Sequence, residues 1–228
     1  MPKIRINALV LETFQRLFGV TAFLEVVDKA IPQAEWHERE DLRRLAEEEN
    51  WDFGDYDVQS QVLDEKFGHW LPRLAAYSLI MLLDSIVETQ LFAFAERLGR
   101  KKGSNFQVKD MKGRGLEPAA LYVKRVAPEL DVGKDPAWED IRNLEKLRNI
   151  IVHRGGTRGK SEEQQKQTRE LVQAYPGKLL LPVTADTIYG EIWVSLSLCR
   201  DFAAKIEDFF KRVFKAAGLP DRGMLIER

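Results

Sequence analysis

The chain has 228 residues, with 35 basic and 36 acidic side chains and a net charge of -1. This balance excludes an overall electrostatic attraction to nucleic acid or to a membrane surface, so any such contact must come from a local patch. The hydrophobic share of 44% is enough for a substantial core and excludes global disorder. Cys199 is the only cysteine, so an intramolecular disulfide is excluded, and its apolar neighbours predict a packed thiol.

The first 70 residues show helical patterns separated by short breaks. Apolar residues at helical spacing predict a helix over 3–31, with Pro32 as its end. Residues 33–50 are densely charged, which is typical of a solvated helix. A loop is expected at 52–57, because acids and aromatics alternate there, and another helix is expected at 58–70.

The most hydrophobic segment is residues 73–98. A helix of this length spans on the order of 40 Å, and its apolar character on nearly all sides predicts a central position in a bundle. Asp84 and Glu88 interrupt it, and a buried carboxylate needs a partner, so a guanidinium from a neighbouring helix is expected beside one of them. Charges interrupt every apolar run and no secretory signal is evident, so we expect a soluble, cytoplasmic protein without membrane contact.

A basic connector over 105–114 precedes a short predicted helix at 117–126. Its cationic side chains are Lys109, Lys112 and Arg114. They make the connector a candidate phosphate-binding surface, and a merely solvated loop is the alternative.

The remaining pattern is again helical. Trp138 opens a helix with apolar residues at a clean spacing of three and four. Residues 157–173 are polar and predict a loop or a solvated helix, 179–184 predict a short extended segment, and 186–217 predict a last long helix. Strand signals are nearly absent, so the sequence predicts an all-α, multi-helix bundle with little or no β structure.

Arg148, Asn149 and His153 stand together at the end of the helix that begins at Trp138. Asn149 and His153 are four residues apart and share a helix face, with Arg148 beside them. Such a group can hold an anion and transfer a proton. A structural explanation stays open, because helix C-termini favour Arg and His, which complement the dipole, and Gly155 is a natural end residue.

The segment 148–153, RNIIVH, resembles the Arg-Asn-x-x-x-His signature of the HEPN superfamily. The similarity extends to the apolar helix at 73–98, which looks like the helix that precedes the signature in several HEPN families. The connector and short helix at 110–126, followed by the helix at 138–153, also resemble one branch of the superfamily. The resemblance covers roughly residues 70–215.

This resemblance implies a HEPN-type helical domain at residues 61–228, with residues 1–60 as an extra helical region packed on the bundle. It implies a homodimer that brings two signatures together in a cleft. Many members are metal-independent ribonucleases acting as toxins or in phage defence, whereas others are non-catalytic modules. Some toxin members carry a tyrosine two positions after the histidine; Gly155 stands there in this chain, so regulation by modification of that residue is not expected.

The resemblance also implies roles for individual residues. His153 would act as general acid or base, Arg148 would stabilise the phosphate, and Asn149 would orient His153 or the scissile phosphate. Glu88, preferred for a tertiary contact, or Glu145, one turn earlier on the same helix, would fix Arg148. RNA supplies its own nucleophile, the 2′-hydroxyl, so no metal and no cofactor are expected.

Two functions from different classes remain open at this level. The first is an endoribonuclease that cuts single-stranded RNA as a homodimer, with an antitoxin or defence protein as a further partner. Its expected RNA contacts are Lys109, Lys112, Arg114, Arg154 and Arg158. The second is a non-catalytic module that binds nucleotide, RNA or protein. The near-neutral charge favours the second slightly, whereas the complete group of Arg, Asn and His favours the first.

Overall fold

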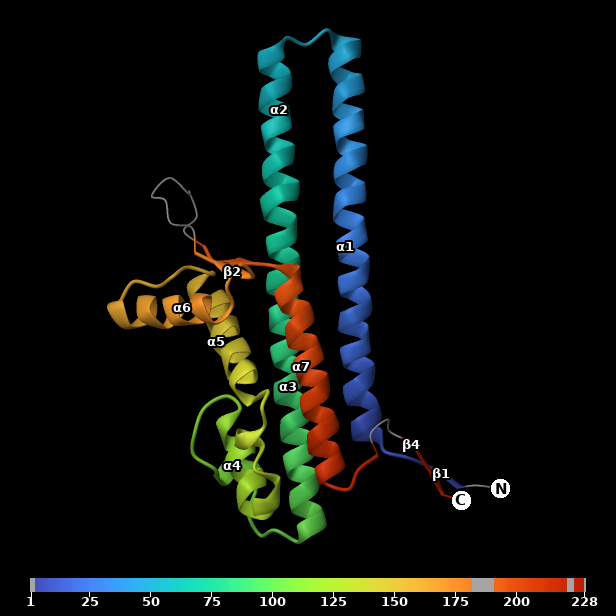
Figure 1. Ribbon diagram of the computed structural model, residues 1–228, viewed down its shortest axis with the longest axis vertical. Helices are drawn as coiled ribbons and strands as arrows, with labels where there is room; N and C mark the ends of the chain where they lie inside the picture. Colours follow the sequence, from blue (N-terminus) through green and yellow to red (C-terminus); the bar gives the residue numbers. More distant parts are fainter. Residues whose placement is uncertain (1–2, 182–190, 221–223, 228) are drawn as a thin grey trace.

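The computed structural model describes residues 3–181, 191–220 and 224–227, and it confirms the all-α character of the chain (Figure 1). Its α-helices are α1 (Ala8–Glu49), α2 (Phe53–Glu65), α3 (Leu71–Lys102), α4 (Glu117–Val126), α5 (Trp138–Arg154), α6 (Glu162–Ala174) and α7 (Leu196–Ala216). A π-helical turn at Lys66–Trp70 joins α2 to α3. Short 3-10 turns occupy Val108–Asp110, Pro128–Leu130 and Val132–Lys134. Two antiparallel pairs complete the described part: β1 (Lys3–Ile6) with β4 (Met224–Glu227), and β2 (Leu179–Leu180) with β3 (Trp193–Val194).

Helix α3 lies at the centre of the bundle and packs against α1, α4, α5 and α7. Its core face is fully buried, with Leu79, Leu83 and Phe94 at 0–1% exposure. A buried hydrogen bond of 2.9 Å between Thr13 and Gln90 joins α1 to α3. The prediction of a central helix over 73–98 therefore holds, and the π turn stands where the sequence suggested the end of the preceding helix.

Helix α7 begins later than the sequence suggests. The predicted start near residue 186 is wrong at least for the described part, because Trp193–Val194 pairs with β2 and the helix starts only at Leu196. The Ser195 hydroxyl accepts the backbone N–H of Leu198 at 3.2 Å, which is an N-cap. Residues 186–190 of the prediction lie outside the described residues.

Pro32 does not end the first helix, contrary to the prediction, because α1 continues through it to Glu49. A proline inside a helix removes one backbone hydrogen bond, here to the carbonyl of Asp28. Pro32 is exposed, so water can satisfy that carbonyl. The loop predicted at 52–57 is also wrong, because Asp52 caps α2 by accepting the N–H of Asp55 at 2.9 Å.

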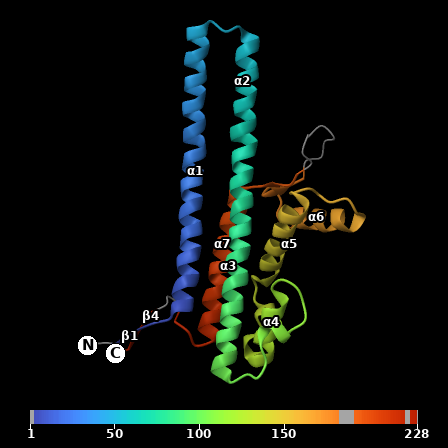
Figure 2. The same ribbon diagram turned by 180° about the vertical axis from the view of Figure 1, so that it is seen from behind.

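The distal part of α1 and all of α2 form a two-helix hairpin that projects beyond the bundle (Figures 1 and 2). We call residues 33–65 the arm. Helix α2 has no buried residue, so the arm has no core of its own. Surface ion pairs hold its two helices together: Arg39 contacts Asp64 at 2.5 Å, and Glu38 contacts Lys66, the residue that follows α2, at 2.6 Å. Each such pair contributes about 1 kcal/mol or less.

The helical segment from Phe53 to Lys102 is long and apolar enough to cross a membrane by length and hydropathy alone. Its most apolar stretch is 56% buried within the bundle. The central helix of a soluble helical bundle has the same signature, because it is surrounded by other helices.

Candidate functional site

A groove of about 600 Å³ lies between α3, α5, the connector before α4, and the start of α6. These elements lie together on one side of α3 in Figure 1, with α1 on the other side. The residues that line the groove are Asp84, Glu88, Arg114, Gly115, Leu116, Glu145, Arg148, Asn149, His153, Arg154, Gln164 and Gln167. All three residues of the predicted catalytic group are among them.

Helix α5 presents this group because its opposite face is buried. The buried apolar residues are Ile141, Leu144, Leu147, Ile150 and Ile151. With that stripe against the core, Asn149 and His153 are exposed and Arg148 is half-buried. The accessible imidazole is the condition that acid–base chemistry on a bound ligand requires.

The end of α5 is fixed tightly after His153. Gly155 adopts a left-handed conformation, with φ of 59°, and its N–H bonds the carbonyl of Ile150. Gly156 also has a positive φ of 81°, and a Cβ there would lie 2.2 Å from the hydroxyl oxygen of Tyr77. Tyr77 in turn donates to the carbonyl of Ile192 at 2.6 Å. The two glycines are therefore required by the helix end and by the close approach of Tyr77.

Arg148 is held by a buried carboxylate from α3. Its Nε lies 3.5 Å from Oδ2 of Asp84, which is only 5% exposed. Burial raises the pKa of Asp84 to about 6, Arg148 opposes this rise, and Glu145 and Glu88 add to it. Arg148 also donates to Oδ1 of Asn149 at 3.0 Å. Asp84 and Asn149 thus hold the Arg148 guanidinium from two sides.

The expectation of a guanidinium beside Asp84 or Glu88 is met at Asp84. The preference for Glu88 as the group that fixes Arg148 is not met, because the ion pair of Arg148 in the described part of the chain is with Asp84. Glu88 is exposed and lines the same groove one turn further along α3. Spacing alone could not separate the two carboxylates, since both face the same side of one helix.

Glu145 holds the connector, and its ion pair in the described part of the chain is with Arg142, not with Arg148. Its carboxylate contacts Arg142 at 2.9 Å and accepts the backbone N–H of Leu116. A Cβ on Gly115 would lie 1.6 Å from Oε1 of Glu145, so only glycine fits there. Burial raises the pKa of Glu145, and Arg142 opposes that rise. Glu145 therefore brings the start of α4 against α5 and closes one wall of the groove.

The basic residues expected to contact RNA separate into two groups. Arg114 lines the groove, whereas Lys109 and Lys112 are exposed on the connector outside it. Arg154 lines the groove, but its guanidinium bonds the carbonyl of Arg158, as well as groups of α6, at 3.4 Å. Partial burial lowers the pKa of Arg154. Arg158 is exposed and is not among the residues that line the groove.

Helix α6 adds a wall that the sequence did not assign. Gln164 and Gln167 of this helix line the groove, in the segment expected to be a loop or a solvated helix. A capping box between Ser161 and Gln164 starts the helix. The Ser-x-x-Gln spacing was the available signal for this helix, but nothing local pointed it toward α5.

The groove is close to balanced in charge. Its carboxylates are Asp84, Glu88 and Glu145, and its guanidiniums are those of Arg114, Arg148 and Arg154. Asp84 and Glu145 both have raised pKa values because of burial, which weakens the negative side of the balance as pH falls. Within the described ranges, no group of three or more His, Cys, Asp or Glu side chains is arranged to hold a metal ion. The groove therefore holds the His153 imidazole among three guanidiniums and three carboxylates.

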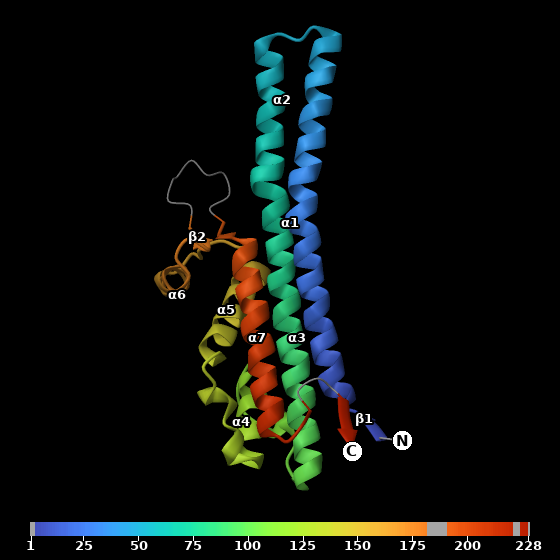
Figure 3. The same cartoon turned by 45° about the vertical axis from the view of Figure 1, so that its right-hand side comes forward.

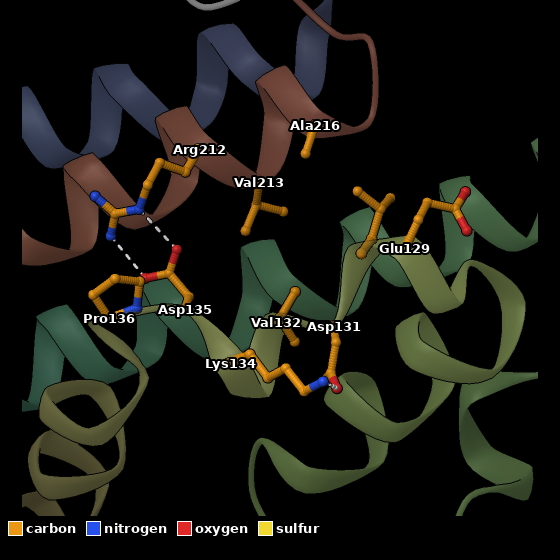
Figure 4. Close-up of a pocket in the computed structure, with 10 residues that line it drawn as sticks. Glu129, Asp131, Val132, Lys134, Asp135, Pro136, Arg212, Val213 and Ala216 are labelled. Carbon is orange, nitrogen blue, oxygen red and sulfur yellow. Dashed lines mark hydrogen bonds and ion pairs between the residues drawn. The ribbon is translucent and has the colours of Figure 1, made fainter.

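A second cavity, of about 260 Å³, lies between α7 and the turns before α5 (Figure 4). Arg212 bonds both oxygens of Asp135, at 2.8 and 2.7 Å, and Asp135 also accepts the N–H of Ala137. Asp131 contacts Lys124 at 3.1 Å. These charged groups pair with one another. The ion pair between Arg212 and Asp135 therefore fixes the start of α5 against α7.

No family model matches the chain, and no curated protein or solved structure matches it either.

Proposed function

We propose that the protein is a metal-independent endoribonuclease of HEPN type that acts as a homodimer. The observation that carries the proposal is the accessible His153 beside Arg148, whose guanidinium a buried Asp84 holds in an open groove. A helix end that needed only capping would not require a buried carboxylate aimed at its arginine. Burying that carboxylate is unfavourable, as the raised pKa of Asp84 indicates, so a compensating role is expected.

In the proposed reaction, a base removes the proton of an RNA 2′-hydroxyl, and the oxygen attacks the adjacent phosphorus. The bond from phosphorus to the 5′-oxygen breaks, an acid protonates that oxygen, and a cyclic phosphate remains. Arg148 would stabilise the charge on the phosphate, with Arg114 on the facing wall of the groove. Asn149, bonded to Arg148, keeps the guanidinium in position.

The groove of one chain contains one histidine, His153, whereas the reaction uses both an acid and a base. A second copy related by a two-fold axis would supply the other. The surface suited to it is the outer face of α3, where Trp70, Leu74, Met81 and Leu82 are 37%, 57%, 40% and 46% exposed. We call these four residues, with Ser78, Ser85 and Phe92 on the same side, the apolar face. It extends over about 33 Å of helix.

The apolar face borders the groove. Asp84 and Glu88 lie on its edge, within one turn of Ser85, and both line the groove. Two copies packed through this face about a two-fold axis near Met81 would therefore hold their grooves next to each other. This arrangement makes one composite site from two His153 and two Arg148 side chains.

The test is cleavage of an unstructured, end-labelled RNA by purified protein in the presence of EDTA. We expect cyclic-phosphate ends from the wild type and a loss of at least about 100-fold in rate for His153→Ala and for Arg148→Ala. Gln173→Ala, a change on α6 outside the groove lining, is the matched control and should cleave like the wild type. Cleavage that survives in both site variants, or is absent from the wild type, contradicts the proposed reaction.

The alternative is a non-catalytic module that binds nucleotide, RNA or protein in the same groove. The balanced charge of the groove favours it, because a strongly positive lining would be expected for a tight RNA channel. In the same experiment, RNA that is bound but not cut, with binding lost in Arg148→Ala and kept in His153→Ala, would support this alternative.

A further inference from the structure

The net charge of -1 conceals a separation of charge along the molecule. Residues 47–57, at the tip of the arm, contain six carboxylates and no lysine or arginine. Residues 97–114, at the opposite end of α3 and in the connector, contain seven lysines and arginines and one aspartate. We call these segments the acidic tip and the basic end. Figure 3 shows them at opposite ends of the long helical column.

Both segments hold charges without local partners. No basic side chain in the described part lies within ion-pair distance of the acidic-tip residues Glu47, Glu48 or Asp57. In the basic end, Arg97 and Lys101 are exposed and likewise have no ion pair among the described residues. Unpaired like charges at this density repel one another, so each segment would be stabilised by an oppositely charged surface.

The two segments lie on opposite sides of the centre of the apolar face, at similar distances from it. That face runs from residue 70 to residue 92, so its midpoint is Met81. Asp57, the residue of the acidic tip nearest to the face, precedes Met81 by 24 residues, and Lys102, the last residue of α3, follows it by 21. At 1.5 Å per residue, Asp57 lies about 36 Å and Lys102 about 32 Å from Met81 along the helical column.

We propose that the acidic arm docks on the basic end of a second copy of this chain, in an antiparallel dimer whose two-fold axis passes near Met81. This inference rests on the dimer of the proposed function and adds its contact surfaces. A two-fold axis there places α2 of one copy beside the last turns of α3 in the other, and the reverse contact is made at the opposite end. The midpoint of the apolar face and the separation of charge are independent observations, and both lead to the same arrangement.

The direction of the side chains agrees with this arrangement. Arg100 follows Leu82 by 18 residues, which is five full helical turns, so it lies on the same side of α3 as the apolar face. The arm, which has no buried residue in α2, would gain in the dimer the packing that it lacks alone. Phe53, 85% exposed at the start of α2, would lie about 10 Å beyond the end of α3 in the second copy.

The proposal can be tested by exchanging the charges. The arm variant carries Glu47→Lys, Glu48→Lys and Asp57→Lys, and the base variant carries Arg97→Glu, Arg100→Glu and Lys101→Glu. All six positions are exposed, so folding should be retained, and circular dichroism checks this. Sedimentation equilibrium of the full-length chains, between 50 mM and 500 mM salt, measures the dimer dissociation constant.

We expect the wild-type dimer to weaken with salt, and each variant alone to dissociate at least 10-fold more readily than the wild type. An equimolar mixture of the two variants should restore the dimer, because both of its contacts then join opposite charges. A chain carrying all six changes should dimerise like the wild type. Glu25→Lys is the control, because this exposed residue lies one turn before Asp28, which pairs with Arg200 of α7, away from the apolar face.

A monomeric wild type, single variants that dimerise normally, or a mixture that stays dissociated would each overturn the inference. If the arm variant dimerises like the wild type, the acidic tip does not contact a second copy of the chain and would be a surface for another basic partner. Association and RNA cleavage are measured separately. A restored dimer without cleavage by the wild type would leave this inference intact and contradict the proposed reaction.

Discussion

The two halves of α1 show how one helix can be stabilised in two ways. In its first half, Leu9, Val10, Leu17, Val20, Leu24 and Val27 are buried against the bundle. Beyond Val27 the same helix has no buried residue, and beyond its contact with α7 at Asp28 it runs beside α2 and the π turn. The first half is held by tertiary packing, whereas the second depends on helix propensity, ion pairs within the arm and, in the proposed dimer, a second copy. Mutations should therefore have large effects in the bundle and small ones in the arm.

The largest contrast is expected for the removal of an apolar side chain. Phe94→Ala, at a site 1% exposed in the centre of α3, should lower the free energy of unfolding by about 3–5 kcal/mol. Val62→Ala in the arm, at a site 47% exposed, should lower it by less than about 1 kcal/mol. Urea unfolding of both variants measures the difference. Equal losses would mean that the arm has a packed core of its own.

A second contrast is between a buried carboxylate of the bundle and an exposed one of the arm, in how the free energy of unfolding depends on pH. The pKa of Asp84 is raised from 3.8 to about 6, so the folded state holds this proton at a pH where the unfolded state has released it. The free energy of unfolding should therefore fall as pH rises from about 4 to about 6, by on the order of 3 kcal/mol at 1.36 kcal/mol per pKa unit. Asp84→Asn should remove most of this fall.

Urea unfolding of wild type and Asp84→Asn at pH 4, 5, 6 and 7 tests this expectation. Glu48→Gln, at an exposed carboxylate of the arm, is the control and should retain the wild-type dependence on pH. If Asp84→Asn and the wild type show parallel curves, the buried carboxylate is not the origin of the fall.

The smallest contrast concerns glycine. Gly156→Ala adds a Cβ 2.2 Å from the Tyr77 hydroxyl oxygen, at a φ of 81°, and should destabilise the protein by about 1–3 kcal/mol. Gly68→Ala, at the base of the arm, meets no atom within 4 Å and should stabilise it by about 0.5–1 kcal/mol. Thermal unfolding monitored by circular dichroism compares the two. A neutral Gly156→Ala would show that the end of α5 can move away from Tyr77.

Periodicity predicted the helices of the bundle well because their apolar faces are buried. The short helix at 117–126 was predicted with the boundaries of α4, and the buried stripe of α5 matches the predicted spacing. The failures lie where the apolar pattern does not decide, because an exposed helix carries no such pattern and a short buried strand resembles a helix face; Ile192 and Val194 are 0–1% exposed. Pro32 was read as an end although its helix is exposed there, and Ile192 and Val194 were assigned to a helix face although Val194 pairs in a strand.

The site was predictable where its residues are close together in the sequence. Arg148, Asn149 and His153 are local in sequence, so their shared helix end could be inferred from spacing. The choice between Asp84 and Glu88 as the partner of Arg148 depends on how α3 is rotated against α5, which no local pattern contains. The contribution of α6 likewise depends on the turn after Gly156.

The sequence by itself determined the helical class, the central position of the apolar helix and the group of polar residues at the end of α5. These follow from hydrophobic periodicity and from residues only a few positions apart. Only the tertiary structure decided that Asp84 holds Arg148, that Glu145 anchors the connector, and that the acidic tip and the basic end lie at opposite ends of one helical column. Those relations join residues that are far apart in the sequence, and the packing of helices, not the local pattern, sets them.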